Sequence, residues 1–236
     1  MLSPVRCLAV QCLQAGGIGR VIGSDVIRVA RGLATSQSAV RIASHLLENK
    51  DPEQVASMQH ELLPIVDMED RVIGARSKAD CHLMANIESG LLHRAFSVLL
   101  YNSDNQFLLT QRTAAKITFP GYFTNACCSH PAATEEEMDS SNDFIGIRRA
   151  AKRRLVFELG IDPQQLHLSD IHFMTRVVYQ AGSDDPIWGE HEMDYVLVIK
   201  KDLAIRPNPC EVMYWKYLSQ TEVELLLGKS DSCDET

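Results

Sequence analysis

The chain has 236 residues, 45% hydrophobic and 23% charged, which suits one globular domain of roughly 150 to 200 residues plus additional segments. Charged residues or glycine interrupt every apolar run before the about 18 to 20 residues of a membrane-spanning helix, so the sequence excludes a membrane span. The net charge of −8 argues against nucleic acid as a partner, and an anionic substrate would need placed cations or metal ions.

Residues 1–45 have an unusual composition, with five arginines, one acidic residue and many small side chains. This pattern is typical of a mitochondrial transit peptide, and a disordered tail is the alternative. We therefore expect mitochondrial localisation, with cytoplasmic or peroxisomal residence as alternatives, and a single folded domain at residues 46–236. The odd number of seven cysteines, without a CxxC pair, favours a reducing compartment.

The first half of the domain predicts a helix and two hairpins. The helix is expected at 53–62, and the first hairpin has apolar strands at 64–67 and 71–75. The second hairpin pairs a buried strand at 95–101 with a strand at 106–111 across a polar turn.

The second half mixes helices and strands. Apolar residues recur near a 3.6 period over 143–159, and Gly160 follows where helices commonly end in a left-handed residue. Strands are expected at 171–180, 193–200 and 212–217. A last helix begins at Ser219, whose spacing to Glu222 is that of a capping box. This order predicts an α+β fold, a compact α/β/α sandwich with a mixed sheet.

Two acids and several imidazoles are candidate metal ligands. On a strand, Glu190 and Glu192 point to one side, opposite an apolar face; a solvated surface is the simpler interpretation unless partners lie nearby. Those partners are His82, His93 and His130, which stand in unusual local strings. Three imidazoles and two carboxylates suit zinc or manganese better than magnesium.

Cysteines and cations form the second group of candidates. Cys127 and Cys128 are adjacent, and one of them fits a small buried side chain, whereas Cys128 shares a face with His130 in an extended segment. The cations are either solvated or line an anion pocket, because arginine and lysine bind diphosphates. They are Lys78, Arg112, Lys116, Arg153 and Arg154.

The stretch from Arg153 to Ile161 resembles the end of the Nudix box, G-x5-E-x7-R-E-U-x-E-E-x-G-U, where U is apolar. Glu158 and Gly160 fit the pattern, but Arg154 and Phe157 replace two of its acids. Nudix hydrolases use those acids to gather metal ions for attack by water, so this helix is poorly equipped for hydrolysis.

The chain from about Val66 to Tyr217 resembles the type I isopentenyl-diphosphate isomerases, proteins of Nudix-like fold that isomerise their substrate. The matching strings, in order, are Cys81-His82-Leu83, Gly90-Leu91-Leu92-His93-Arg94-Ala95-Phe96-Ser97, Phe119-Pro120-Gly121, Thr124-Asn125-Ala126-Cys127-Cys128-Ser129-His130-Pro131 and Trp188-Gly189-Glu190-His191-Glu192.

The resemblance implies a role for each site residue. A divalent ion, Zn²⁺, Mn²⁺ or Mg²⁺, would be held by His82, His93, His130, Glu190 and Glu192. The substrate would contact Lys78, Arg112, Lys116, Ser129 and Arg154. Glu158 would bind a Mg²⁺ that bridges the diphosphate. Cys128 is the expected catalytic thiol, working with Glu192 and Tyr179.

The implied reaction moves a double bond in a five-carbon diphosphate, which requires an acid and a base on opposite sides of the carbon chain and a dry pocket. We expect a monomer with a small diphosphate substrate. Family members usually continue beyond Leu227 with a helical segment carrying a tryptophan, which this chain lacks. A catalytically inactive metal-binding relative and a Nudix diphosphohydrolase are the alternatives.

Overall fold

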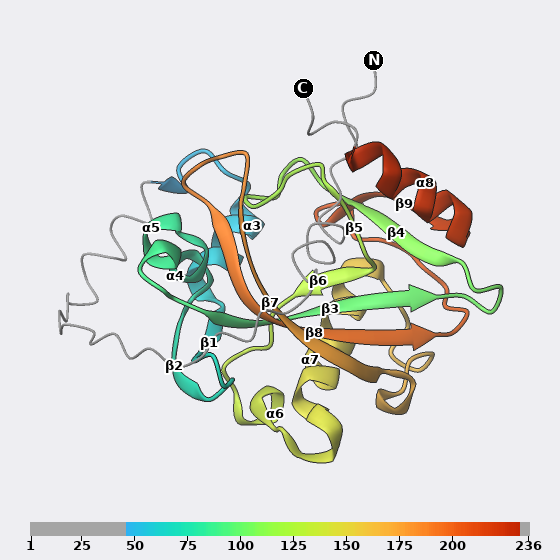
Figure 1. Ribbon diagram of the computed structural model, residues 1–236, viewed down its shortest axis with the longest axis horizontal. Coiled ribbons are helices and arrows are strands. Elements are labelled where there is room, and N and C mark those ends of the chain that lie inside the picture. Colours follow the sequence, from blue (N-terminus) through green and yellow to red (C-terminus); the bar gives the residue numbers. More distant parts are fainter. Residues whose placement is uncertain (1–45, 232–236) are drawn as a thin grey trace.

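The computed structural model describes residues 46–231 (Figure 1). The predicted targeting segment at 1–45 lies outside the described residues. In the part that is described, no helix has both the length and the apolarity needed to cross a bilayer.

Nine strands form one mixed sheet. They are β1 (Leu62–Val66), β2 (Val72–Ser77), β3 (His93–Tyr101), β4 (Phe107–Arg112), β5 (Phe123–Thr124), β6 (Cys127–Ser129), β7 (His172–Gly182), β8 (Gly189–Lys200) and β9 (Val212–Leu218).

Strand β3 is the centre of this sheet. One edge of β3 pairs in parallel with β8 along its whole length. The other edge pairs in turn with β1, β6 and β4, all antiparallel. Strand β7 extends the sheet beyond β8, and β9 extends it beyond β4. Because β3 has neighbours along both edges, side chains from distant parts of the chain meet around it.

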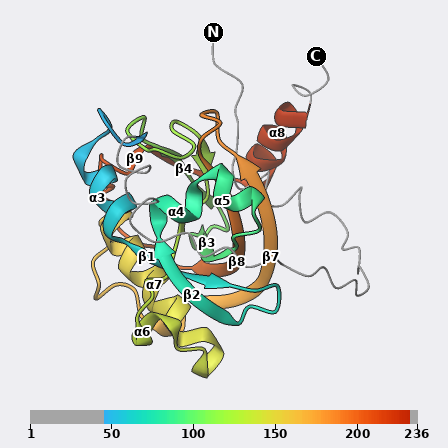
Figure 2. The same cartoon turned by 90° about the vertical axis from the view of Figure 1, so that its left-hand side faces the viewer.

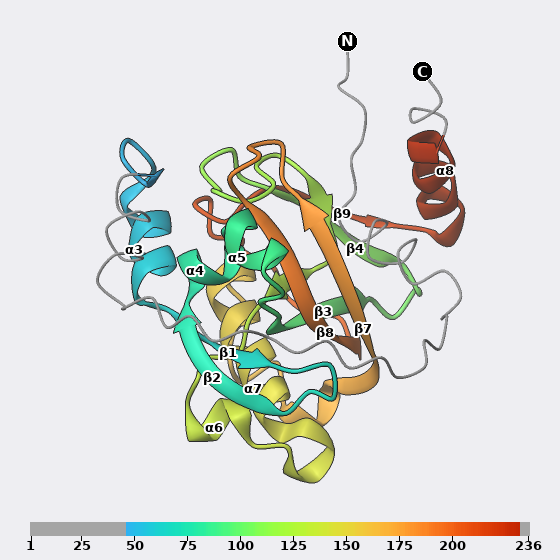
Figure 3. The ribbon, with the colours of Figure 1, turned by 60° about the vertical axis from the view of Figure 1, so that its left-hand side comes forward.

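The helices stand on several sides of the sheet. They are α3 (Pro52–His60), α4 (Lys78–His82), α5 (Met84–Glu88), α6 (Glu135–Met138), α7 (Ser141–Leu159) and α8 (Gln220–Asp231). Figure 3 shows α3, α4 and α5 on one side of the molecule and α8 on the opposite side. Helices α4 and α5 contact β8, and Figure 2 shows them in front of β3 and β8.

The main core lies between the sheet and α7. Phe96, Val98 and Leu100 of β3 pack there against Ile147 and Leu155 of α7, all of them buried. This packing leaves the other face of β3, with His93 and Ser97, turned toward α4 and the loops.

Gly160 ends α7 with a φ of 59°. A Cβ at this position would lie 2.1 Å from the carbonyl oxygen of Arg206, so the close approach of the two segments requires glycine. The structure thus confirms the predicted helix end.

The predicted fold is confirmed, and the differences lie at the boundaries. Helix α3 ends at His60 because Leu62 already pairs in β1, and Ser219 caps α8 through mutual bonds with Glu222. Strand β8 begins at Gly189, four residues before its predicted start, because it continues to pair with β7. The short helices α4 and α5 were not predicted, since neither is long enough to show a period.

Candidate active site

Three adjacent strands bring two histidines to one carboxylate. His93 and Glu192 are paired across β3 and β8, so their side chains share a face of the sheet. His130 follows β6, which pairs with the other edge of β3. The Nε2 atoms of His93 and His130 lie 3.2 and 3.0 Å from Oε1 of Glu192.

The third histidine comes from the short helix α4. Ser77 caps this helix, and a bridge between Leu83 and Trp188 holds its end against the start of β8. Nδ1 of His82 lies 2.8 Å from the carbonyl oxygen of Lys78. A carbonyl only accepts hydrogen bonds, so Nδ1 carries the proton and Nε2 keeps its lone pair for the site.

His82, His93, His130 and Glu192 form a buried group that can hold a metal ion. One ligand atom from each residue lies within 4.8 Å of all the others, and the three rings are in mutual contact. Burial lowers the pKa of His130 to about 4 and that of His82 well below its usual value. The imidazoles of His82 and His130 are therefore neutral, the form that binds metals.

The chemistry of this donor set fits a divalent cation. Nδ1 of His93 and Nδ1 of His130 are buried without a hydrogen-bond partner, so protein contacts alone leave the rings unsatisfied. Burial would raise the pKa of Glu192, but hydrogen bonds from His130 and His93 keep it well below its usual value. An ionised carboxylate beside imidazoles is a donor set that suits a divalent metal ion.

Glu190 and Tyr179 complete this side of the site. The hydroxyl of Tyr179 lies 3.0 Å from Oε2 of Glu190 and 2.6 Å from Oε2 of Glu192, so it joins the two carboxyl groups. Glu190 and Glu192 are both buried, which excludes a solvated surface for these acids. Burial and then the charge of Glu192 raise the pKa of Glu190 to about 8.

Cys128 lies on the same face of the sheet, across the other edge of β3. It pairs with Ser97, and its Sγ atom is 3.4 Å from Ser97 Oγ and 2.6 Å from Oδ1 of Asn125. The amide oxygen of Asn125 can only accept, so the thiol donates to it. Burial and then the nearby Asp194 raise the pKa of Cys128 to about 12, so the thiol is protonated at neutral pH. Cys127 faces the core, as one cysteine of the pair was expected to do.

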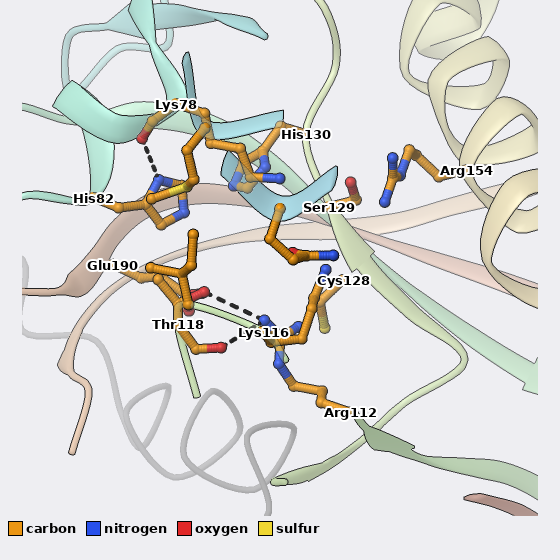
Figure 4. A pocket seen from close by; sticks show the side chains of 13 residues that line it. Lys78, His82, Arg112, Lys116, Thr118, Cys128, Ser129, His130, Arg154 and Glu190 are labelled. Carbon is orange, nitrogen blue, oxygen red and sulfur yellow. Dashed lines mark hydrogen bonds between the residues drawn. The ribbon is translucent and has the colours of Figure 1, made fainter. Parts of the chain in front are cut away.

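A pocket beside the thiol gathers cations from separate elements. Figure 4 shows Lys78 from the start of the short helix α4, Arg112 from the end of β4 and Arg154 from the long helix α7 around one space with Ser129 and Cys128. The pocket is lined by Gln54, Met58, Lys78, His82, Arg112, Lys116, Ile117, Thr118, Cys128, Ser129, His130, Arg154 and Glu190. All five predicted substrate-binding residues therefore meet at one place.

Arg153 is not part of this pocket, contrary to one of the two interpretations of the cations. Its Nε and NH2 atoms bond both carboxylate oxygens of Glu137, at 2.6 and 2.8 Å, and NH2 also donates to the carbonyl oxygen of His130. On α7, adjacent residues point in directions about 100° apart, so only Arg154 faces the pocket.

Comparisons with known proteins identify the family of this chain. Residues 91–233 match the family model of the NUDIX domain. Isopentenyl-diphosphate Delta-isomerase 1 of Bos taurus is 51% identical over 183 residues, which cover 78% of this chain and 79% of that protein. Isopentenyl-diphosphate delta-isomerase 2 of Homo sapiens is 51% identical over 72% of this chain and 74% of its own. The chain belongs to the isopentenyl-diphosphate delta-isomerase family.

One solved structure resembles part of this chain. A solved structure from Deinococcus radiodurans covers 71% of this chain and 89% of its own, with 16% identity and a TM-score of 0.49. Within this isomerase-family chain, α7 keeps only one acid of the Nudix box, Glu158, whose Oε1 accepts bonds from Arg154 at 3.0 and 2.7 Å. Phe157, at the position of a box acid, is 46% exposed and stacks under Arg154.

Several residues around the site of this isomerase-family chain were not predicted. Ser97 and Asn125 hold the thiol, and Glu61 and Glu211 bond the pocket lysines. Ser97 and Asn125 stand within the matched strings, so their positions in the sequence were available. Glu61 and Glu211 stand in no such string, and only the tertiary structure brings them to the pocket.

Proposed function

We propose that this chain interconverts isopentenyl diphosphate and dimethylallyl diphosphate in isoprenoid biosynthesis. The observation that carries the proposal is the placement of the Cys128 thiol and the Glu192 carboxylate. They stand on the same face of the sheet, on the two strands that flank β3, next to a pocket lined by four cations. The names of the relatives, members of the same family, support this substrate.

The reaction requires two proton transfers. One end of an unactivated alkene accepts a proton, which leaves a tertiary carbocation, and a neighbouring carbon then releases a proton to form the new double bond. A protonated acid and an ionised base must therefore be present together. The protonated Cys128 and the ionised Glu192 meet this need.

The two groups exchange their protonation states during one conversion. The thiol gives its proton to one end of the alkene, and the Glu192 carboxylate accepts the proton that leaves the other end. The resulting thiolate and carboxylic acid are the pair needed for the opposite direction. Tyr179 fixes the Glu192 carboxylate by its hydrogen bond of 2.6 Å, so the base stays aligned in both directions.

The cations of the pocket bind the diphosphate. Lys78, Arg112, Lys116 and Arg154 offer several donors, and Ser129 adds a hydroxyl at the pocket wall. Glu158 lies behind Arg154, and a buried carboxylate oxygen fits Mg²⁺ that arrives with the diphosphate.

The buried group of His82, His93, His130 and Glu192, called the histidine group below, binds the second ion of the proposal. We propose zinc or manganese at His82, His93, His130, Glu190 and Glu192, with magnesium as the alternative. Such an ion would fix the carboxylates and tune the proton affinity of the Glu192 carboxyl group. All three histidine side chains are buried, so this region is shielded from bulk solvent.

Conversion of isopentenyl diphosphate by the purified full-length chain, loaded with zinc or manganese and supplied with magnesium, tests this proposal. Cys128→Ala and Glu192→Gln each remove one proton-transfer group, and the expected loss of turnover is roughly 100-fold to 10,000-fold. Cys210→Ala is the matched control, because Cys210 is a free thiol outside the pocket. Turnover that survives both site variants would contradict the proposal.

The same assay separates isomerisation from hydrolysis. A Nudix hydrolase would release phosphate, whereas the isomerase leaves the diphosphate intact. Two of the box acids are replaced by Arg154 and Phe157 on α7, so we expect no phosphate release. Release of phosphate at the rate of substrate loss would make the chain a hydrolase.

A further inference from the structure

Three of the four cations in the pocket are bonded to carboxylates that stand behind them. Lys78 bonds Glu61 at 3.2 Å, Lys116 bonds Glu211 at 2.5 Å, and Arg154 bonds Glu158 at 2.7 Å. None of these carboxylates belongs to the pocket lining. Arg112 differs, because it donates to the carbonyl oxygens of Thr118 and Phe119.

Glu61 sits at the end of α3 and holds Lys78 from one side. Its Oε1 accepts a hydrogen bond from Ser57 Oγ at 2.8 Å, and the Lys78 ammonium donates both to Oε2 of Glu61 and to Ser57 Oγ. Burial would raise the pKa of Glu61, but Lys78 and Arg154 hold it at about 2. Glu61 is therefore a fixed negative charge.

Glu211 holds Lys116 in the same way from the other side of the pocket. It is 6% exposed, and Gln54 Nε2 donates to its Oε1 at 3.2 Å while Lys116 bonds Oε2. An Arg154 nitrogen lies 3.8 Å from the same Oε2 atom. A lysine side chain has many rotamers, so a buried partner that selects one of them prepares the ammonium group for a ligand.

The carboxylates also set the charge of the pocket. The three carboxylates offset three of the four cations, so these seven side chains carry a net charge of one positive, and Glu190 in the pocket lining adds at most one negative charge. A terminal diphosphate carries more negative charge than this excess can balance. A divalent cation bound to the diphosphate supplies the missing positive charge.

We propose that Glu61 and Glu211 are positioning residues of the anion pocket, an inference that rests on the proposed function. They hold Lys78 and Lys116 in place and leave the pocket too weakly positive to bind a free diphosphate as tightly as its complex with a divalent cation. The pocket thus selects the metal complex of the diphosphate over the free anion. A purely structural role would instead make both acids matter for folding alone.

Calorimetric titration with inorganic diphosphate, with and without Mg²⁺, tests this role in the full-length protein. The protein is first loaded with zinc and dialysed without a chelator, so the histidine group stays filled. The readout is the ratio of the two affinities. We expect wild-type protein to bind at least about tenfold more tightly with Mg²⁺ than without it.

Glu211→Gln and Glu61→Gln remove the charge but keep an oxygen that accepts from the lysine. Each variant is expected to bind diphosphate more tightly in the absence of Mg²⁺. The ratio of the affinity with Mg²⁺ to the affinity without it should therefore fall roughly fivefold to tenfold. Glu211→Ala lowers the ratio equally but weakens both affinities relative to Glu211→Gln, because Lys116 loses its partner. Glu61 is partly exposed, so its variant keeps the test available if Glu211 variants do not fold.

Glu137→Gln is the matched control. Glu137 is a buried carboxylate paired with Arg153 outside the pocket lining, and its loss leaves the ratio unchanged. A ratio that stays at the wild-type value in both glutamine variants would overturn this inference alone. Wild-type protein that fails to bind the magnesium complex of diphosphate would instead overturn the proposed substrate class.

Discussion

Tyr179 and Glu192 are direct neighbours across β7 and β8, and their side-chain oxygens lie 2.6 Å apart. The same hydroxyl reaches Glu190 at 3.0 Å. One phenol therefore sets the orientation of the proposed base and of its neighbouring acid. This relationship depends on register, since a shift of one residue would turn Tyr179 to the opposite face of the sheet.

Tyr179→Phe should lower kcat without disturbing substrate binding. The variant keeps the ring but loses a hydrogen bond to a charged group, which contributes about 1.5 to 3 kcal/mol, so we expect kcat to fall roughly tenfold to hundredfold. KM should change little, because Tyr179 does not line the cation pocket. Steady-state kinetics measure both, with Tyr101→Phe as a control distant from the pocket. An increase in KM alone would contradict this role.

Arg153 and Arg154 should behave in opposite ways although they are adjacent. Arg154→Ala removes a donor from the pocket, and we expect KM to rise roughly tenfold to hundredfold. Arg153→Ala breaks the ion pair between Arg153 and Glu137, in which the arginine side chain is partly exposed. This loss should lower the free energy of unfolding by about 1 kcal/mol and leave KM unchanged. Denaturant unfolding and kinetics on both variants separate the two effects. Equal KM values would remove Arg154 from the pocket.

The sequence contained enough information to distinguish these two arginines. The buried residues of α7 include Ile147, Ala150, Ala151, Leu155 and Glu158. Arg154 belongs to this stripe by its spacing of four from Ala150 and Glu158, whereas Arg153 does not. The helical period of the segment therefore indicates that Arg154 turns inward, whereas composition alone groups it with Arg153.

The candidate site residues could be found from the sequence because they stand in short strings with unusual composition. Their grouping could not be found, because it depends on pairing. His93 and Glu192 meet only through the parallel β3–β8 register, and Cys128 meets Ser97 only through β6. Glu61 and Glu211 lie near opposite ends of the described chain and carry no local signal, so only the folded structure reveals them.

Metal removal should destabilise the protein through the histidine group. A ligand that binds only the folded state stabilises it by about 2.7 kcal/mol when its concentration is 100 times its Kd. We expect zinc or manganese to raise the melting temperature of metal-free protein, and His82→Ala to abolish most of this increase. Metal content and thermal melting measure the two quantities.

His172→Ala is the control for this prediction, because His172 is exposed on β7 and lies outside the histidine group. It should keep both the bound metal and the increase in melting temperature. The same increase in His82→Ala and in wild-type protein would show that the metal binds elsewhere.

Lys116 should make diphosphate binding and stability respond to pH in opposite directions. Burial and then the charge of Arg112 lower the pKa of Lys116 from 10.5 to about 8. As pH rises through about 8, Lys116 loses its charge in the folded protein, so diphosphate binding weakens. The unfolded chain keeps this proton up to about pH 10.5, so it binds more protons between these values.

By proton linkage, stability therefore rises with pH across this window, by on the order of 2 to 3 kcal/mol from this group. Lys116→Met removes the titrating amine and should remove its part of both trends, leaving binding weaker at every pH. Calorimetry with inorganic diphosphate and denaturant unfolding between pH 7 and pH 10.5 measure the two responses. Identical pH profiles for Lys116→Met and wild-type protein would assign the titration to another group.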